Sequence, residues 1–165
     1  MSRVLAIDPG NIESAYCILR RDGLRPLAHG KVENRALEEM IHSGELAFDE
    51  VCIEMVASYG MPVGREVFDT CAEIGRLSFL FERMGFEPHG VYRKEVKLHL
   101  CGQARAKDSN IRMALIERFC KHDFKHGKGT KDKPDWFYQF RADEWSAYAV
   151  GLTYIETGGN GEKTD

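Results

Sequence analysis

Three acidic residues stand in apolar surroundings at distant points of the sequence, namely Asp8, Glu54 and Asp143. Asp8 ends the first apolar run of the chain, and Glu54 interrupts a later run at residues 51–56. Asp143 belongs to the first turn of an expected helix. A carboxylate in such surroundings is costly unless a cation meets it. Carboxylates that cluster also repel one another, so a cluster predicts a bound cation, and ligation by oxygen alone favours Mg²⁺ or Mn²⁺.

Each of these acids also has an ordinary structural interpretation. Asp8 precedes Pro9 and Gly10 and can simply open an Asx-type turn. Glu54 can pair with a buried arginine or lie exposed at the end of its strand. The helix dipole would account for Asp143, because acids are common in the first turn of a helix.

The elements that must position the three acids follow from apolar periodicity and turn residues. The second and third expected strands should pair antiparallel, because Arg21-Asp22-Gly23 between them is typical of a tight hairpin turn. The expected strands cover residues 3–8, 14–21, 24–33, 51–56 and 90–92, and the expected helices cover residues 36–43, 65–84, 94–101, 109–120 and 142–157.

This order resembles that of the ribonuclease H-like fold, an α/β fold with a mixed five-stranded sheet flanked by helices. In that fold the first strand and the strand after the first helix are neighbours, so Asp8 and Glu54 would face one another. The last helix would bring Asp143 to the same edge of the sheet. Two metal ions held there can activate water and stabilise the leaving oxygen of a phosphodiester.

The bulk properties indicate one globular domain. The chain has 165 residues, of which 43% are hydrophobic and 30% are charged, and its net charge is −3. We expect one ribonuclease H-like domain over residues 1–157 and a disordered tail over residues 158–165. No apolar run approaches the length of a membrane span, and no charged-then-apolar leader precedes Asp8. Five scattered cysteines fit a reducing compartment, so we expect a soluble, cytoplasmic protein without membrane contact.

The expected helix at 65–84 has apolar residues on two sides, which predicts two burial surfaces. One surface should face the sheet, and the other could face a further helix or a second copy of the chain. The first is expected to contain Val67, Cys71, Ile74 and Phe81, and the second Phe68, Ala72, Gly75 and Phe79.

The expected loop at 121–140 contains many lysines among aromatic residues. Basic and aromatic side chains interleaved in one loop suit a nucleic-acid strand, which offers phosphates and stackable bases. The alternative is a surface loop whose aromatic residues pack on the core. The aromatic residues are Trp136, Phe137, Tyr138 and Phe140.

Four segments of the chain, in the same order, resemble motifs of the RuvC-type Holliday-junction resolvases. Residues 5–10 (LAIDPG) are similar to the opening motif, and residues 52–54 (CIE) to the second. Val96, Lys97, Gly102 and residues 105–107 resemble the basic segment, and residues 142–150 the closing helix. The likeness extends over residues 3–155.

The resemblance implies a homodimeric crossover junction endodeoxyribonuclease of bacterial or phage origin, which binds four-way DNA junctions and cuts two opposed strands with Mg²⁺, or with Mn²⁺ in its place. It assigns catalysis and metal binding to Asp8, Glu54 and Asp143, to which we add Glu144 as the candidate for a fourth position. It also implies an aromatic or apolar residue inserted into the junction from the loop after the second acid. The DNA-binding residues would be Tyr59, Met61, Arg65, Lys94, Lys97, Arg105, Lys107 and Arg112.

The closing helix departs from the family pattern. The family has a second acidic or His position three residues after the first, where this chain has Ser146. Glu144 could supply the missing oxygen and is the preferred candidate, because hard divalent ions favour charged oxygen. Alternatively, Ser146 could orient a water molecule. Lys107 also comes one position earlier than the family pattern would place its lysine.

Two alternatives for the function remain open. Fold and metal site do not fix the substrate, so the chain could be a related nuclease for other branched or flapped DNA or for RNA–DNA hybrid. It could also be a module that binds junctions without cutting, which the serine at position 146 would allow.

Overall fold

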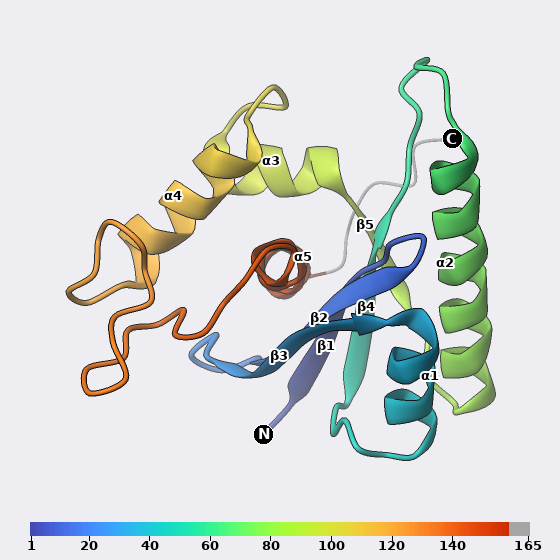
Figure 1. Cartoon of the computed structure of the whole chain (residues 1–165), viewed down its shortest axis with the longest axis horizontal. Coiled ribbons are helices and arrows are strands. Elements are labelled where there is room, and N and C mark those ends of the chain that lie inside the picture. Colours follow the sequence, from blue (N-terminus) through green and yellow to red (C-terminus); the bar gives the residue numbers. More distant parts are fainter. Residues whose placement is uncertain (159–165) are drawn as a thin grey trace.

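Five strands form one mixed sheet in the order β3-β2-β1-β4-β5 (Figure 1). The computed structural model of the chain describes residues 1–158. The strands are β1 (Arg3–Asp8), β2 (Glu13–Arg20), β3 (Pro26–Glu33), β4 (Glu50–Met55) and β5 (His89–Tyr92). The helices are α1 (Asn34–His42), α2 (Arg65–Arg83), α3 (Arg93–Cys101), α4 (Asp108–Phe119) and α5 (Glu144–Thr157). The fold is the α/β, ribonuclease H-like arrangement that the sequence predicts.

The sheet combines an antiparallel and a parallel half. β1 pairs antiparallel with β2 and β2 with β3, whereas β1 pairs parallel with β4 and β4 with β5. In the parallel pair β1 and β4, Ile7 lies opposite Ile53. The next residue of each strand is therefore an acid, Asp8 in β1 and Glu54 in β4, and both acids lie at the same edge.

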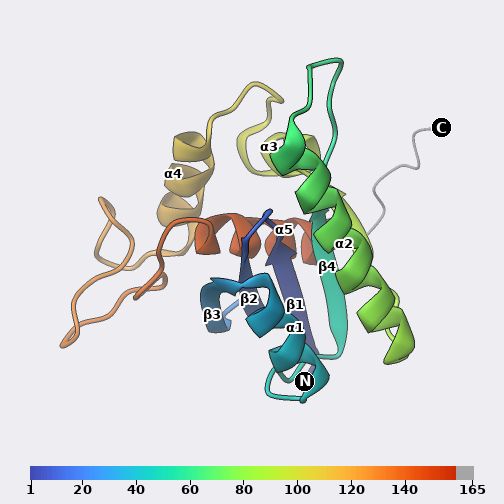
Figure 2. The same ribbon diagram turned by 45° about the vertical axis from the view of Figure 1, so that its right-hand side comes forward.

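Helices cover both faces of the sheet, which explains why residues 4–7 of β1 are all apolar and buried. α5 crosses one face, and α1 and α2 cover the other (Figures 1 and 2). Val4 and Ala6 belong to the core cluster that contains residues of α5, and Leu5 and Ile7 belong to the cluster of α1 and α2. Successive side chains of a strand point to opposite faces, so each core takes alternate residues of β1.

The structure corrects the predicted inner face of the long helix. Ile74 and Phe81 are buried as expected, but Cys71 is exposed, and Glu73 and Leu77 are buried in its place. The buried stripe is therefore rotated about the helix axis relative to the predicted one, and it includes the acid Glu73. On the opposite side Phe68 and Phe79 expose 62% and 65% of their surface, so this second apolar face lies open in the single chain.

The aromatic residues of the loop between α4 and α5 pack on the core. Phe137 and Phe140 are fully buried, and Trp136 stacks on Phe119 with ring centroids 5.0 Å apart. The packing alternative is therefore confirmed for these three aromatic residues. Phe124 is the exception, because 57% of its surface is exposed.

Two expectations concern the ends and the surroundings of the chain. The expected tail at 158–165 lies, apart from Gly158, outside the described residues. No helix among residues 1–158 is long and apolar enough to cross a membrane.

Candidate active site

Asp8 and Glu54 are in direct contact at the carboxyl ends of β1 and β4. Glu54 lies close enough to raise the pKa of Asp8 through hydrogen bonding and charge repulsion, which favours a proton on one of the two carboxyl groups. Burial raises the pKa of Asp8 to about 9, with further contributions from Glu54 and Asp143 and an opposing one from Arg93. The negative charge at this edge is therefore only partly compensated by the protein itself.

The turn after Asp8 is fixed by hydrogen bonds from two other elements. The hydroxyl group of Ser14 accepts the Gly10 N–H at 3.1 Å and donates to Oδ1 of Asn34 at 2.7 Å. Nδ2 of Asn34 in turn donates to the carbonyl of Gly10 at 2.9 Å. A Cβ atom at Gly10 would lie 2.2 Å from the carbonyl oxygen of Glu13, so the turn needs glycine there. These contacts hold Asp8 in place at the end of its strand.

Arg93 meets the Glu54 carboxylate. It is the first residue of α3 and follows β5, the parallel neighbour of β4. Its Nη1 atom donates to Oε1 of Glu54 at 2.9 Å, and its Nη2 atom bonds the carboxylate of Asp108. The pairing with arginine, one of the two interpretations left open by the sequence, is thus present in the structure.

Asp143 directly precedes α5 and pairs with a lysine of the sheet. Nζ of Lys31 lies 2.7 Å from Oδ2 of Asp143, and half of the Asp143 side chain is exposed. The hydrogen bond with Asp143 raises the pKa of Lys31. Lys31 lies opposite Ala15, which lies opposite Asp8, so these three residues form one row across the sheet.

The structure places the side chain of Glu144, a predicted ligand, against His29 rather than beside the other acids. Its side chain is buried against His29, and its Oε2 atom accepts the Arg141 N–H at 3.1 Å. His29 is two residues before Lys31, so Glu144 lies over the next row of the sheet, roughly 7 Å away along the strands. Of these two adjacent acids, Asp143 raises the pKa of Asp8 and Glu144 does not.

Ser146 lies on the same side of α5 as Asp143. The two residues line a cavity of about 120 Å³, together with Arg93 and Arg112 and with residues of α3 and α4. A group at position 146 therefore faces the space next to the acids, as the alternative interpretation of Ser146 requires.

The three acids offer the donor set that suits Mg²⁺ or Mn²⁺, because all of their ligating atoms are carboxylate oxygens. The raised pKa of Asp8 also marks a carboxyl group without a sufficient cationic partner. Within residues 1–158, however, no group of three or more His, Cys, Asp or Glu side chains is arranged to hold a metal ion. Arg93 and Lys31 pair with two of the three acids, so an ion bound there must share Glu54 with Arg93 and Asp143 with Lys31, or displace these partners.

The loop after β4 and the first residue of α2 carry three of the residues predicted to bind DNA. The loop projects beyond the rest of the molecule between β4 and α2 (Figure 2). Tyr59 and Met61 expose 63% and 70% of their surface, and Arg65 forms an exposed contact of 3.6 Å with Asp69. Tyr59 has a φ of +47°, which is uncommon for a residue other than glycine.

The other predicted DNA-binding residues lie on α3, on α4 and between them. Four are exposed and Lys97 is half-buried. Arg112 lies over the ring of Trp145 at 4.8 Å, which ties it to the start of α5. The five residues are Lys94, Lys97, Arg105, Lys107 and Arg112.

Three residues of this region were missed by the sequence analysis: Lys31, Arg93 and His29. Each pairs with an acid that had been singled out. Two features of the sequence could have pointed to these partners. Arg93 directly follows an apolar strand, and Lys31 is a lysine within a strand. Neither feature identifies a partner without the strand register.

Comparisons with known proteins bear on the fold. No family model and no curated protein matches the sequence. A solved structure of RuvC from Thermus thermophilus is similar with a TM-score of 0.66 and 16% identity, over 95% of this chain and 97% of that chain. The chain has a RuvC-like fold. A structure of T. thermophilus RuvC in complex with a Holliday junction substrate is similar with a TM-score of 0.68 and 15% identity, over 98% of this chain and 97% of that chain.

Proposed function

We propose that this protein is a divalent-metal-dependent endonuclease that resolves four-way DNA junctions by hydrolysing one phosphodiester in each of two opposed strands. The observation that carries the proposal is the contact of Asp8 with Glu54, with Asp143 near enough to raise the pKa of Asp8, in a RuvC-like fold. The similar RuvC structure with a Holliday junction substrate supports this substrate class.

In this proposal the acids hold the ions and the basic residues hold the DNA. Asp8, Glu54 and Asp143 would bind Mg²⁺ or Mn²⁺, which supplies an activated water and stabilises the leaving oxygen. Arg93 and Lys31 keep Glu54 and Asp143 paired until the ion binds, which limits repulsion in the free protein. The exposed basic residues of α3 and α4 would position the phosphate backbone without reading sequence.

Two coordinated cuts need two active sites, so we propose a symmetric dimer. A four-way junction has twofold character, and a twofold pair of subunits matches it. The open face of α2, with Phe68 and Phe79, is the surface we assign to this contact because large apolar side chains are exposed there. Tyr59 and Met61 would then reach the junction centre from the projecting loop.

The proposal is tested by cleavage of a synthetic four-way junction with Mg²⁺ or Mn²⁺. Nicked, flapped and fully paired duplexes and an RNA–DNA hybrid are assayed beside it. Paired cuts in the junction, absent with Asp8→Asn, are the expected result. Cleavage of the flapped or hybrid substrate in preference to the junction would instead assign the chain to a related nuclease class.

One observation favours a second candidate, a module that binds junctions without cutting them. Arg93 and Lys31 already hold two of the acids, and Ser146 stands where a further carboxylate is expected from the family. Junction binding without cleavage, at every concentration of either metal, would support this candidate over the nuclease.

A further inference from the structure

The loop between α4 and α5 carries five lysines, and we refer to residues 120–141 as the lysine loop. None of the five forms an ion pair with another residue in the described part of the chain. Four are exposed, and Lys128 is half-buried. The lysines are Lys121, Lys125, Lys128, Lys131 and Lys133.

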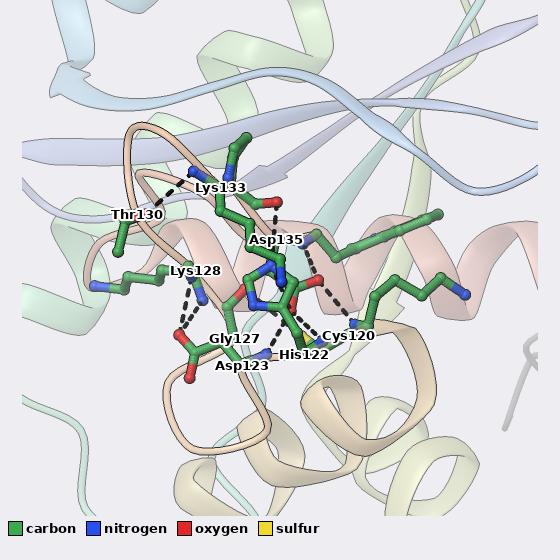
Figure 3. A network of polar contacts seen from close by, with 12 residues as sticks. Cys120, His122, Asp123, Gly127, Lys128, Thr130, Lys133 and Asp135 are labelled. Carbon is green, nitrogen blue, oxygen red and sulfur yellow. Dashed lines mark hydrogen bonds and ion pairs between the residues drawn. The ribbon is translucent and has the colours of Figure 1, made fainter.

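The carboxylate of Asp135 is turned inward and bonds backbone amides. It accepts N–H groups from Lys121 at 2.9 Å, His122 at 2.9 Å and Asp123 at 2.7 Å, and from Trp136 at 2.8 Å. Burial alone would raise the pKa of Asp135, but these donors hold it well below its usual value. Asp135 therefore keeps its charge while its oxygens are occupied by the loop backbone (Figure 3).

Asp123 is used in the same way. It accepts the N–H groups of His126 at 3.0 Å, Lys128 at 3.1 Å and Gly129 at 2.9 Å. These bonds lower its pKa to about 2. Figure 3 shows the Lys128 side chain pointing away from this network. The remaining acid of the loop, Asp132, is exposed, so the outer surface has an excess of positive charge.

Two glycines fix the path of the loop backbone. Gly127 has a φ of +76°, and a Cβ atom there would lie 2.8 Å from Ile116 and 3.2 Å from Trp145. Gly129 has a φ of +67°, and a Cβ atom there would lie 2.3 Å from the carbonyl oxygen of Lys133. The loop backbone is thus closely packed against α4 and α5 at Gly127, and the lysines project from this packed backbone.

The loop is anchored beside the candidate active site. Phe137 packs on Trp145 of α5 with ring centroids 4.5 Å apart, and on Tyr148 at 5.1 Å. The loop ends at Arg141, two residues before Asp143. A ligand held by the lysines is therefore held at a set position relative to the acids.

We propose that the lysine loop is a second nucleic-acid contact, which binds the phosphate backbone of a DNA arm leading away from the candidate active site; this rests on the proposed function. Lysine is a compact point charge suited to phosphate, and five on one loop match a polyanion with regularly spaced charges. The inward Asp123 and Asp135 shape the backbone without cancelling this surface by direct pairing with lysine. The contact carries no sequence preference, because phosphates are the same at every base pair.

The test compares two double variants with the same loss of charge. Lys125→Gln with Lys131→Gln removes two charges from the lysine loop. Arg3→Gln with Arg83→Gln removes two exposed charges on the α1–α2 side of the sheet, at the start of β1 and at the end of α2. Binding of a labelled four-way junction is measured by fluorescence anisotropy between 50 and 200 mM salt in EDTA, so that cutting does not interfere.

The logarithm of the binding constant falls as the logarithm of the salt concentration rises. In the loop variant this fall is expected to be less steep, by about two units of slope, since each phosphate contact contributes roughly 0.9. The control variant and Lys125→Arg with Lys131→Arg should keep the wild-type slope. A loop variant with the wild-type slope and an unchanged melting temperature would overturn the inference while leaving the proposed function intact.

Two outcomes for the wild-type protein separate this inference from the proposed function. If the wild type binds the junction but cuts no substrate with Mg²⁺ or Mn²⁺, the nuclease proposal fails. The inference about the lysine loop is then still decided by the salt dependence of junction binding. If the wild type binds no nucleic acid at all, both are overturned.

Discussion

The guanidinium group of Arg93 donates a hydrogen bond of 2.9 Å to the carboxylate of Glu54. Only 12% of the Glu54 side chain is exposed, so this bond supplies its main compensation in the free protein. The same arginine reaches Asp108, and thereby ties β4 to the starts of α3 and α4. A metal ion that binds Glu54 must share it with Arg93 or displace it.

We expect Arg93→Gln to destabilise the metal-free protein by about 1–3 kcal/mol, because Glu54 is left with weak compensation. Unfolding by urea in EDTA measures this, with Arg83→Gln as the control for loss of an exposed arginine. Mg²⁺ should restore part of the stability, since it takes the place of the lost cation. An Arg93→Gln protein as stable as the wild type in EDTA would contradict the prediction.

Asp8 should make the metal-free protein less stable as the pH rises. Its pKa is about 9 in the folded protein and 3.8 in the reference state, so the folded state binds more protons between these values. Stability is therefore greatest below about pH 4 for this group and is lost as the pH rises towards about 9. Melting temperatures in EDTA at several pH values should fall less steeply for Asp8→Asn than for the wild type.

The control for Asp8 is Asp132→Asn, which changes an exposed acid in the lysine loop. Its melting temperatures should follow the wild-type pH dependence. Added Mg²⁺ should stabilise the wild type at pH 8 and leave Asp8→Asn almost unchanged. If the melting temperatures of the wild type and Asp8→Asn fell equally with pH, the raised pKa of Asp8 would be contradicted.

Glu73 gives a second pH dependence, away from the candidate active site. Its residue is 4% exposed and its Oε1 atom has no hydrogen-bond partner among residues 1–158. Burial, with repulsion by Glu38, raises its pKa to about 7, against an opposing effect of Arg76. Its contribution to stability is therefore lost between about pH 4.5 and pH 7.

Glu73→Gln should stabilise the protein at pH 8 and have little effect at pH 4.5. In a chain of this size about 1 kcal/mol corresponds to 2–4 °C in melting temperature. Glu66→Gln, an exposed substitution on the same helix, is the matched control. A lower melting temperature for Glu73→Gln at pH 8 would show that the charged form has a favourable partner.

Asp143 and Glu144 should respond differently to removal of charge. Asp143→Asn is expected to abolish cutting, whereas Glu144→Gln should leave the metal dependence of cutting unchanged and lower stability through its contact with His29. Ser146→Asp should lower the Mg²⁺ concentration needed for cutting, because position 146 lines the cavity beside Asp143. The Mg²⁺ dependence of junction cleavage measures all three, and a loss with Glu144→Gln as large as with Asp143→Asn would restore Glu144 as a ligand.

Phe68→Lys or Phe79→Lys should convert a dimer into monomers, because each places a charge in the open apolar face of α2. Analytical ultracentrifugation in the absence of DNA measures the association. Phe124→Lys changes a similarly exposed phenylalanine far from this helix in the sequence and should leave the dimer intact. Persistence of the dimer in both α2 variants, or a monomeric wild type, would place the contact elsewhere or remove it.

Much of the fold followed from local patterns in the sequence. The boundaries of β1 and the order of elements depend on apolar runs and turn residues, which are local properties. The contact of Asp8 with Glu54 followed because two apolar strands, each with an acid near its end, become parallel neighbours in this fold order. Cys71 was wrongly assigned to the core, because apolar character alone did not set the rotation of α2.

The cationic partners of the acids could not be predicted in the same way. Lys31 reaches Asp143 because β3 is in register with β2, and a shift of that register by one residue would place Lys31 on the other face. Glu144 was assigned from its adjacency to Asp143, but adjacent residues of a helix point in directions about 100° apart. These contacts depend on how distant elements pack, which no local pattern contains.

The two edge strands of the sheet have a consequence for behaviour in solution. β3 carries Pro26, Lys31 and Glu33, and β5 has only four residues. Proline cannot donate to a further strand, charged side chains oppose one, and a short edge offers few backbone groups to pair with. Edge-to-edge pairing between the sheets of two copies is therefore disfavoured at both ends, which leaves the helical surfaces as the places where copies of the chain can meet.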